Sequence, residues 1–323
     1  MLLVPDNQRR TLDELDDRLD LESGDRRAKR SAFWAMLALS AVIAVAGVAG
    51  DSTATVIGAM IVAPLSTPIL GIGLGITTGR ARLVTTSMLY VAAGVVLVVV
   101  VGAVVAQLLP NPTNVLANSQ VTGRTSPTLM DLLAAIATGF AGAIAVTRRD
   151  VGDVLPGVAI AISLVPPLGV VGVCLGSGAP ALAVGAFVLF ASNVIALVIT
   201  AMIVLFAAGY GREAAEVHGR ERARAYVVLA LATCAVMVPM VLNSLSSVWA
   251  GQVAGAAKAW LADVPDAQVT GVTWQGRTAT VQVLGPEELP PVDELQAAVD
   301  SLVPWDPTLQ VVHTVGGRYD AGR

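Results

Sequence analysis

The chain has 323 residues, of which 55% are hydrophobic and only 14% charged, and its mean hydropathy is +0.72. Soluble globular proteins contain about 45–50% apolar and about 25% charged residues. Between Arg30 and Arg80 the only charged residue is Asp51, and none lies between Arg82 and Arg124. This composition excludes an ordinary soluble enzyme and predicts a polytopic membrane protein.

Several classes of chemistry lack support in the sequence. The net charge of −4 and the pI near 5.2 argue against nucleic acid as a partner. Cys174 and Cys234 lie in apolar runs, and His218 and His313 are far apart, so neither a disulfide framework nor a metal site is expected. No nucleophile–base pair and no Walker A, GxSxG or HExxH motif occurs. We therefore expect no enzyme activity and no cofactor.

The first segment, residues 1–30, carries charges of both signs and is predicted to be a cytoplasmic amphipathic segment. Thr11 and Glu14 have the spacing of a helix capping box, and Leu12, Leu15 and Leu19 fall on one helical stripe. A short amphipathic helix is one interpretation of this pattern. A solvated tail is the other, because the stripe is narrow.

A transmembrane domain is predicted over residues 31–250, where seven apolar stretches are long enough to cross a bilayer. Clusters of arginine precede the first stretch and follow the second, fourth and sixth, which places the N-terminus in the cytoplasm by the positive-inside rule. We expect a multi-pass protein of the inner (plasma) membrane, with the C-terminal domain on the outer side. The seven stretches lie near 31–50, 53–77, 83–108, 129–147, 152–175, 180–209 and 226–249.

Proline interrupts the second and fifth stretches, at Pro64 and Pro68 in one and at Pro166 and Pro167 in the other. Proline removes a backbone donor and clashes with the preceding turn, so both helices should break or kink. The carbonyls freed in hydrocarbon then need other partners. The two segments could instead be re-entrant, but that topology would move several arginines to the outer side.

An internal repeat becomes visible when the chain is shifted by 99 residues, which superimposes Asp51 on Asp150 and Pro68 on Pro167. Repeat one covers 31–108, repeat two covers 129–209, and 226–249 is an extra span. Because each repeat has three crossings, the second must enter the membrane from the opposite side. The sequence thus predicts an inverted 3+3 repeat, an architecture in which secondary transporters place their sites between discontinuous helices.

The candidate substrate-binding residues follow from these breaks. Polar groups are scarce at depth, and a broken helix exposes backbone groups and dipole ends where lipid offers nothing. Asp51 is the intramembrane carboxylate, with helix capping as its alternative role. The candidates are Asp51, Pro64, Ser66, Thr67, Pro68, Ser163, Pro166, Pro167 and Asn193.

The tail, residues 251–323, is predicted to be a small soluble αββαβ domain. Helices are expected at 253–261 and 291–302, and strands at 268–274, 278–284 and 309–314, with a hairpin turn at Gln275–Gly276. This element order is similar to that of the small BON-type domains of bacterial envelope proteins. The resemblance implies an oligomerisation or sensing module.

Two stretches resemble motifs of one family: DSTATVIGAMIVAPLSTPILG, which begins at Asp51, and LPGVAIAISLVPPL, which begins at Leu155. The family consists of hydrophobic membrane proteins of bacteria and archaea catalogued as domain of unknown function 389. The resemblance covers roughly residues 50–200. It implies a bacterial or archaeal membrane protein and supplies no established activity, and the tail inherits nothing from it.

The fold class expected from the sequence is an all-α polytopic membrane domain plus a small α+β C-terminal domain. The leading functional hypothesis is a homo-oligomeric transporter or channel for a small solute, with its site between the two Pro-broken helices at the repeat interface. The rival is a membrane-anchored sensor or scaffold whose soluble domain binds a ligand or partner. The lipid bilayer is the surrounding partner in either case.

Overall fold

The computed structural model describes residues 4–5, 7–108, 117–151, 164–213, 219–275, 278–303 and 307–316. The chain divides into two compact units, Met1–Met240 and Val241–Arg323, and each is described by itself.

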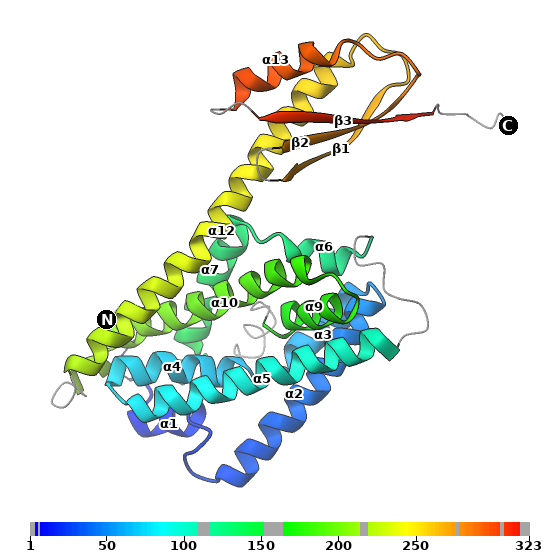
Figure 1. The fold of residues 1–323 in the computed structure, drawn as a ribbon. Coiled ribbons are helices and arrows are strands. Elements are labelled where there is room, and N and C mark those ends of the chain that lie inside the picture. The colour runs from blue at the N-terminus through cyan, green and yellow to red at the C-terminus, as the bar shows by residue number, and fades with distance from the viewer. Residues whose placement is uncertain are drawn as a thin grey trace. The chain divides into compact units, whose positions relative to one another are not determined.

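The first unit is helical (Figure 1). Its helices are α1 (Leu12–Leu19), α2 (Arg26–Ala49), α3 (Thr53–Val62), α4 (Ser66–Thr78), α5 (Ala81–Leu108), α6 (Ser119–Thr125), α7 (Leu129–Thr147), α9 (Val165–Gly176), α10 (Pro180–Ala207) and α11 (Tyr210–Glu213), followed by the start of α12 (Gly219–Trp260).

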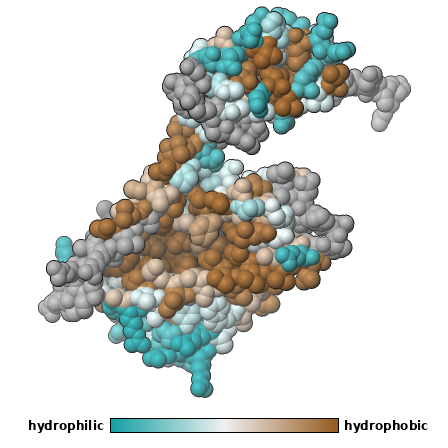
Figure 2. Space-filling model, in the orientation of Figure 1, coloured by the Kyte–Doolittle hydropathy of each residue, from teal (hydrophilic) through white to brown (hydrophobic). Residues whose placement is uncertain are grey.

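Five helices in the described residues are long and apolar enough to cross a membrane: α2, α5, α7, α10 and the part of α12 from Leu229 to Trp260. The number rises to six if α3 and α4, which are bent by 49°, form one broken span. The fifth predicted stretch is described only as the 12-residue α9, because residues 152–163 lie outside the described part. Figure 2 shows apolar residues over much of the helical surface, with hydrophilic ones gathered where α1 and the start of α2 lie. These apolar helices are compatible with a multi-pass membrane protein.

The N-terminal helix α1 packs into the helical unit and is not a solvated tail. The predicted capping box is present, since the Glu14 amide donates to Thr11 Oγ1 (3.3 Å) and the Thr11 amide donates to Glu14 Oε2 (2.7 Å). Leu15 and Leu19 are buried, with exposed fractions of 0% and 2%, in the same core as α2, α4, α5 and α10. The apolar stripe of α1 thus contacts the helical bundle.

Polar contacts fasten this N-terminal segment to the ends of three other helices. Arg80, just after α4, forms a bidentate pair with Asp16 (2.6 and 2.5 Å). Arg149, just after α7, pairs with Glu14 (2.8 Å). The Tyr210 hydroxyl at the start of α11 donates to the Arg10 carbonyl (2.6 Å). The ends of α4, α7 and α10 therefore lie on the side of α1.

The hydrogen bond from Arg149 holds the pKa of the Glu14 carboxyl at about 2. Because this pKa is lowered, the stabilising contribution of the pair is present above the ordinary carboxyl pKa and is lost as pH falls toward about 2. The pair is ionised at neutral pH.

The second unit contains a three-stranded sheet in the order β1-β2-β3, built from β1 (Gln268–Gln275), β2 (Thr278–Gly285) and β3 (Thr308–Val315). β1 and β2 are antiparallel, and β2 and β3 are parallel across the connecting helix α13 (Val292–Leu302). The buried strand residues pack with the last turns of α12 and with α13 in a separate core. The predicted αββαβ order is present, and the turn residue Gly276 lies outside the described residues.

Candidate functional site between the two interrupted helices

The break between α3 and α4 follows from its prolines. α3 ends at Val62, and Ala63 adopts an extended backbone (φ −69°, ψ 122°), as expected for a residue before proline. α4 then begins after Leu65, with Pro68 in its first turn. A proline is tolerated there because the first-turn amides have no partner within the helix.

The start of α9 has the same construction. Leu164 precedes the helix without a side-chain cap, and Val165, Pro166 and Pro167 occupy its first three positions. All four residues are buried. The candidate Ser163, which directly precedes Leu164 in the sequence, lies outside the described residues.

Proline reduces the number of free backbone donors at both helix starts. Of the first three positions in α9 only Val165 has an N–H, and in α4 only Ser66 and Thr67 have one. The Thr67 amide donates to the Pro64 carbonyl (3.2 Å). The two starts therefore offer a ligand only a few backbone N–H groups, fewer than ordinary helix N-termini.

A carbonyl near the end of α3 is bonded from a neighbouring helix. The buried Ser40 hydroxyl of α2 donates to the Ala59 carbonyl (2.8 Å), which also accepts from the Ala63 amide (3.2 Å). The break thus has an internal polar partner, as a low-dielectric surrounding requires. Sequence reasoning missed Ser40, although it is the only hydroxyl between Ala32 and Gly50 in the first span.

The helix turns that follow α4 and α9 are equivalent, at a spacing of 99 residues. Gly79 and Gly178 have left-handed backbones with φ of 72° and 73°. In each turn an amide bonds back five residues: Arg80 to the Gly75 carbonyl (2.8 Å), and Ala179 to the Cys174 carbonyl (2.8 Å). Both are Schellman-type ends, for which glycine is the favoured residue.

Two glycines make reciprocal contacts across the predicted repeats. A Cβ placed on Gly73 of α4 would meet α10 at Val198, Ala201 and Met202. A Cβ placed on Gly172 of α9 would meet α5 at the residues 99 positions earlier, namely Val99, Gly102 and Ala103. Each short helix therefore packs on the long helix of the other predicted repeat, at positions 99 residues apart.

The start of α4 and Asn193 of α10 lie at similar depth, near the middle of the long helices. Leu65 contacts Gly94, the central residue of α5, whose added Cβ would lie 2.9 Å from Leu65 Cδ2. Ser66 precedes Gly73 by seven residues, and Asn193 precedes the α10 residues that Gly73 contacts by five to nine. α4 and α10 both end on the side of α1, so at 1.5 Å per residue Ser66 and Asn193 have about the same depth.

The environment at this depth is mostly apolar. Leu65, Val165 and Leu168 are 0% exposed, whereas Ser66 and Thr67 are half-buried. Pro64 is also half-buried, and Pro68, Pro166 and Pro167 are buried. Asn193 is 6% exposed. The described candidates at this depth thus provide hydroxyl, amide and backbone groups without a formal charge.

Asp51 lies elsewhere, at the end of the bundle opposite α1. It accepts hydrogen bonds from the Ser119 hydroxyl (2.7 Å) and the Gln120 amide (3.1 Å), both at the start of α6. The Ser119 bond lowers the pKa of the Asp51 carboxyl. The N-cap of α3 is Ser52, which accepts from Thr55. The structure thus separates Asp51 from the helix breaks and gives it the role of anchoring α6.

Comparison with known proteins gives a family match over part of the chain. Residues 60–199 match the family described as "Domain of unknown function (DUF389)", which confirms the resemblance noted in the sequence. A protein from Methanocaldococcus jannaschii, named only as uncharacterized, is 33% identical over 196 residues, which cover 61% of this chain and 59% of that protein. The chain thus spans less than two thirds of this relative's length. No solved structure matches.

Proposed function

We propose that this protein, which carries the domain of unknown function DUF389 over residues 60–199, is an integral membrane transporter or channel for a small solute. The proposed site lies between the starts of α4 and α9, near Ser66, Thr67 and Asn193. The observation that carries this proposal is the reciprocal packing of the two short helices on α5 and α10. Transporters commonly bind their substrates where two discontinuous helices face each other at the bilayer midplane.

The contacts also support an inverted repeat. α4 runs toward α1, because Arg80 after it pairs with Asp16. α9 runs along α5 in the other direction, away from α1, since Gly172 contacts Val99 and Gly176 contacts Ala106. Two equivalent helices with opposite directions are related by an axis in the membrane plane, as in inverted-topology transporters.

A full crossing by α3 and α4 is favoured over a re-entrant loop. α3 begins beside the end of α2, where a Cβ on Gly47 would lie 2.8 Å from Val56. α4 ends beside α1, and α1 contacts the start of α2 through the Asp17–Lys29 pair. The bent pair therefore extends between the two ends of α2. A bend of 49° also falls far short of a reversal.

The side chains near the breaks favour an uncharged or weakly charged solute. α4, α9 and α10 contain no Asp, Glu, Lys or Arg. Ser66, Thr67 and Asn193 can donate and accept hydrogen bonds, but they cannot neutralise a strong charge. We infer that the site selects its solute by hydrogen bonding and by size.

Flux through proteoliposomes tests the proposal. Pro68→Ala together with Pro167→Ala would add backbone N–H groups and remove ring volume at both helix starts. We expect at least about a tenfold loss of flux, equivalent to roughly 1.4 kcal/mol. The probes are glycerol and urea in osmotic-swelling measurements, with KCl as the charged comparison.

The matched control is Pro180→Ala, an exposed proline in the first turn of α10. This control should retain wild-type flux. Equal flux in the double variant and the control would contradict a role for the interrupted helices.

We further propose that the N-terminus is cytoplasmic and the C-terminal domain external, in the inner (plasma) membrane. The support is the grouping of Lys29, Arg80 and Arg149 on the side of α1, with which all three form ion pairs. The opposite end of the bundle contains Asp51 and α6, and Arg124 is the basic residue in the last turn of α6. Basic residues gather on the cytoplasmic side of membrane proteins.

Thiol labelling checks this orientation in a Cys234→Ser background, because Cys234 is exposed and Cys174 is buried. A cysteine at Glu288 should react with an impermeant maleimide in intact cells. A cysteine at Asp13 should react only after permeabilisation. The reverse pattern would overturn the orientation. Both positions are exposed.

The alternative function, a membrane-anchored sensor or scaffold, is favoured by the separate hydrophobic core of the second unit. That core allows the tail to act as a binding module. Wild-type protein that transports none of the probes, together with ligand binding by the second unit, would favour the sensor. Homo-oligomerisation stays a prediction.

A further inference from the structure

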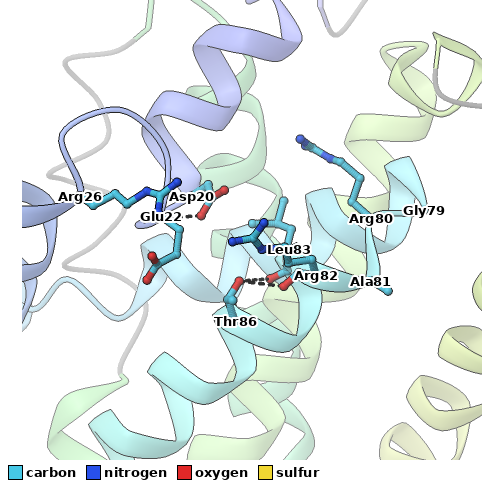
Figure 3. A pocket seen from close by; sticks show the side chains of 9 residues that line it. All are labelled: Asp20, Glu22, Arg26, Gly79, Arg80, Ala81, Arg82, Leu83 and Thr86. Atoms are coloured by element: carbon cyan, nitrogen blue, oxygen red, sulfur yellow. Dashed lines mark hydrogen bonds between the residues drawn. The ribbon is translucent and has the colours of Figure 1, made fainter.

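A polar pocket of about 530 Å³ lies where the link between α1 and α2 meets the start of α5. Figure 3 shows its lining, with side chains from both segments around one opening. A pocket of this size accommodates a small organic ligand. The polar and charged lining residues are Asp20, Glu22, Arg26, Arg80, Arg82 and Thr86.

Some of these charges already have partners. Arg80 pairs with Asp16 (2.5 Å). Glu22 pairs with Arg30 and also accepts a hydrogen bond from the Tyr90 hydroxyl (2.7 Å). These pairs leave Arg80 and Glu22 little capacity for a ligand.

Three charged groups remain available. Within the described residues neither Arg26 nor Arg82 forms an ion pair, and both side chains are exposed. Asp20 accepts one hydrogen bond, from the Glu22 amide to its Oδ1 (2.8 Å), and its carboxylate likewise has no cation within ion-pair distance in that part of the chain. The pocket thus offers two cations and one anion.

The surroundings place this pocket at the edge of the apolar surface. α2 and α5 extend from the pocket, and their residues Leu39 and Leu89 are 58% and 64% exposed. Phe33, Trp34 and Tyr90 form an aromatic cluster beside it, with ring centroids 5.0 to 6.0 Å apart. Aromatic residues of this kind concentrate at membrane–water interfaces. A molecule in the pocket could therefore extend apolar chains along α2 and α5.

We propose that this pocket binds a phospholipid headgroup that carries both a phosphate and an ammonium group. Arg26 and Arg82 hold the phosphate, and Asp20 holds the ammonium. Arginine forms strong charge-assisted hydrogen bonds with phosphate, and basic pockets at membrane interfaces recognise lipid headgroups. The acyl chains lie on the exposed faces of α2 and α5. This site is separate from the one between the interrupted helices.

The Asp20 carboxylate favours a headgroup with an ammonium group over that of a purely anionic lipid. A phosphatidylglycerol headgroup would bring no positive group to Asp20, so the carboxylate would repel its phosphate. A phosphatidylethanolamine headgroup satisfies all three free charges. The exposed apolar faces in turn favour a lipid over a soluble phosphate ester.

Native mass spectrometry of the full-length protein in detergent tests the proposal. The probes are phosphatidylethanolamine, phosphatidylglycerol and soluble O-phosphoethanolamine. We expect wild-type protein to retain phosphatidylethanolamine preferentially. The combined variant Arg26→Gln and Arg82→Gln should lose at least about tenfold in affinity for it, equivalent to roughly 1.4 kcal/mol. Arg27→Gln is the matched control, because Arg27 is exposed but does not line the pocket.

Asp20→Asn provides the discriminating readout, since it keeps an acceptor for the Glu22 amide and removes the charge. It should abolish the preference for phosphatidylethanolamine over phosphatidylglycerol. An unchanged preference in this variant, or unchanged binding in the double arginine variant, would overturn the proposal. So would O-phosphoethanolamine that binds as tightly as the lipid. All these side chains are at least partly exposed, and unchanged melting temperatures would confirm that the variants are folded.

Discussion

Gly172→Ala is expected to destabilise the helical unit by about 1–3 kcal/mol, the usual cost of overpacking a tight contact. The added Cβ would lie 2.4 Å from the Val99 carbonyl oxygen and 2.7 Å from the Gly102 Cα. Both are backbone atoms, so α9 and α5 would have to separate. Fluorescence-detected size-exclusion chromatography after heating measures the loss.

The substitution Gly73→Ala, 99 residues earlier in the other predicted repeat, should be milder. At Gly73 a Cβ would meet the Ala201 Cβ at 2.9 Å and the Val198 carbonyl at 3.3 Å. The control is Gly58→Ala in α3, where a Cβ meets nothing within 4 Å. That control should be neutral or stabilising by up to about 1 kcal/mol, because alanine favours helix. Equal melting of the Gly172 and Gly58 variants would show that α9 and α5 are not packed as described.

Leu15→Ala should detach the N-terminal segment. Leu15 is 0% exposed in the core shared by α1, α2, α4 and α5. Truncating a fully buried leucine costs about 2–5 kcal/mol, through lost transfer free energy and the cavity left behind. Limited trypsinolysis at Arg18 should become faster, and the melting temperature should fall.

The control for this variant is Leu133→Ala on α7, where the side chain is 61% exposed on the membrane-spanning surface. In this variant, lipid fills the space that the shortened side chain leaves. Proteolysis at Arg18 should therefore match that of the wild type. If Leu15→Ala also leaves proteolysis and melting unchanged, the N-terminal segment does not stabilise the bundle.

The N-terminal segment shows why local pattern alone left alternatives open. The spacing of Thr11 and Glu14 predicted a capped helix, and the structure contains it. The pattern could not decide between a bound helix and a solvated tail, because the partners of α1 are distant in sequence. Arg80 and Arg149, which hold Asp16 and Glu14, lie 64 and 135 residues away.

The candidate site was likewise predictable from the sequence only in part. Proline positions identified the break between α3 and α4 and the start of α9, because proline acts on its own backbone. The internal bond from Ser40 to Ala59 and the anchoring of α6 by Asp51 depend on distant neighbours, and sequence reasoning missed both. The sequence groups Asp51 with the breaks, whereas the structure places it at the end of the bundle opposite α1.

Sequence alone determined the apolar, membrane-protein character of the chain, its long apolar helices, the helix break at Pro64 and the element order of the tail. These features depend on hydrophobicity, on periodicity and on residues that act locally. Only the tertiary structure decided that Gly73 and Gly172 make equivalent contacts and that Arg26, Arg82 and Asp20 share one pocket. Such contacts depend on which helices lie side by side, and apolar sequences in a membrane specify that choice only through the detailed fit of small residues.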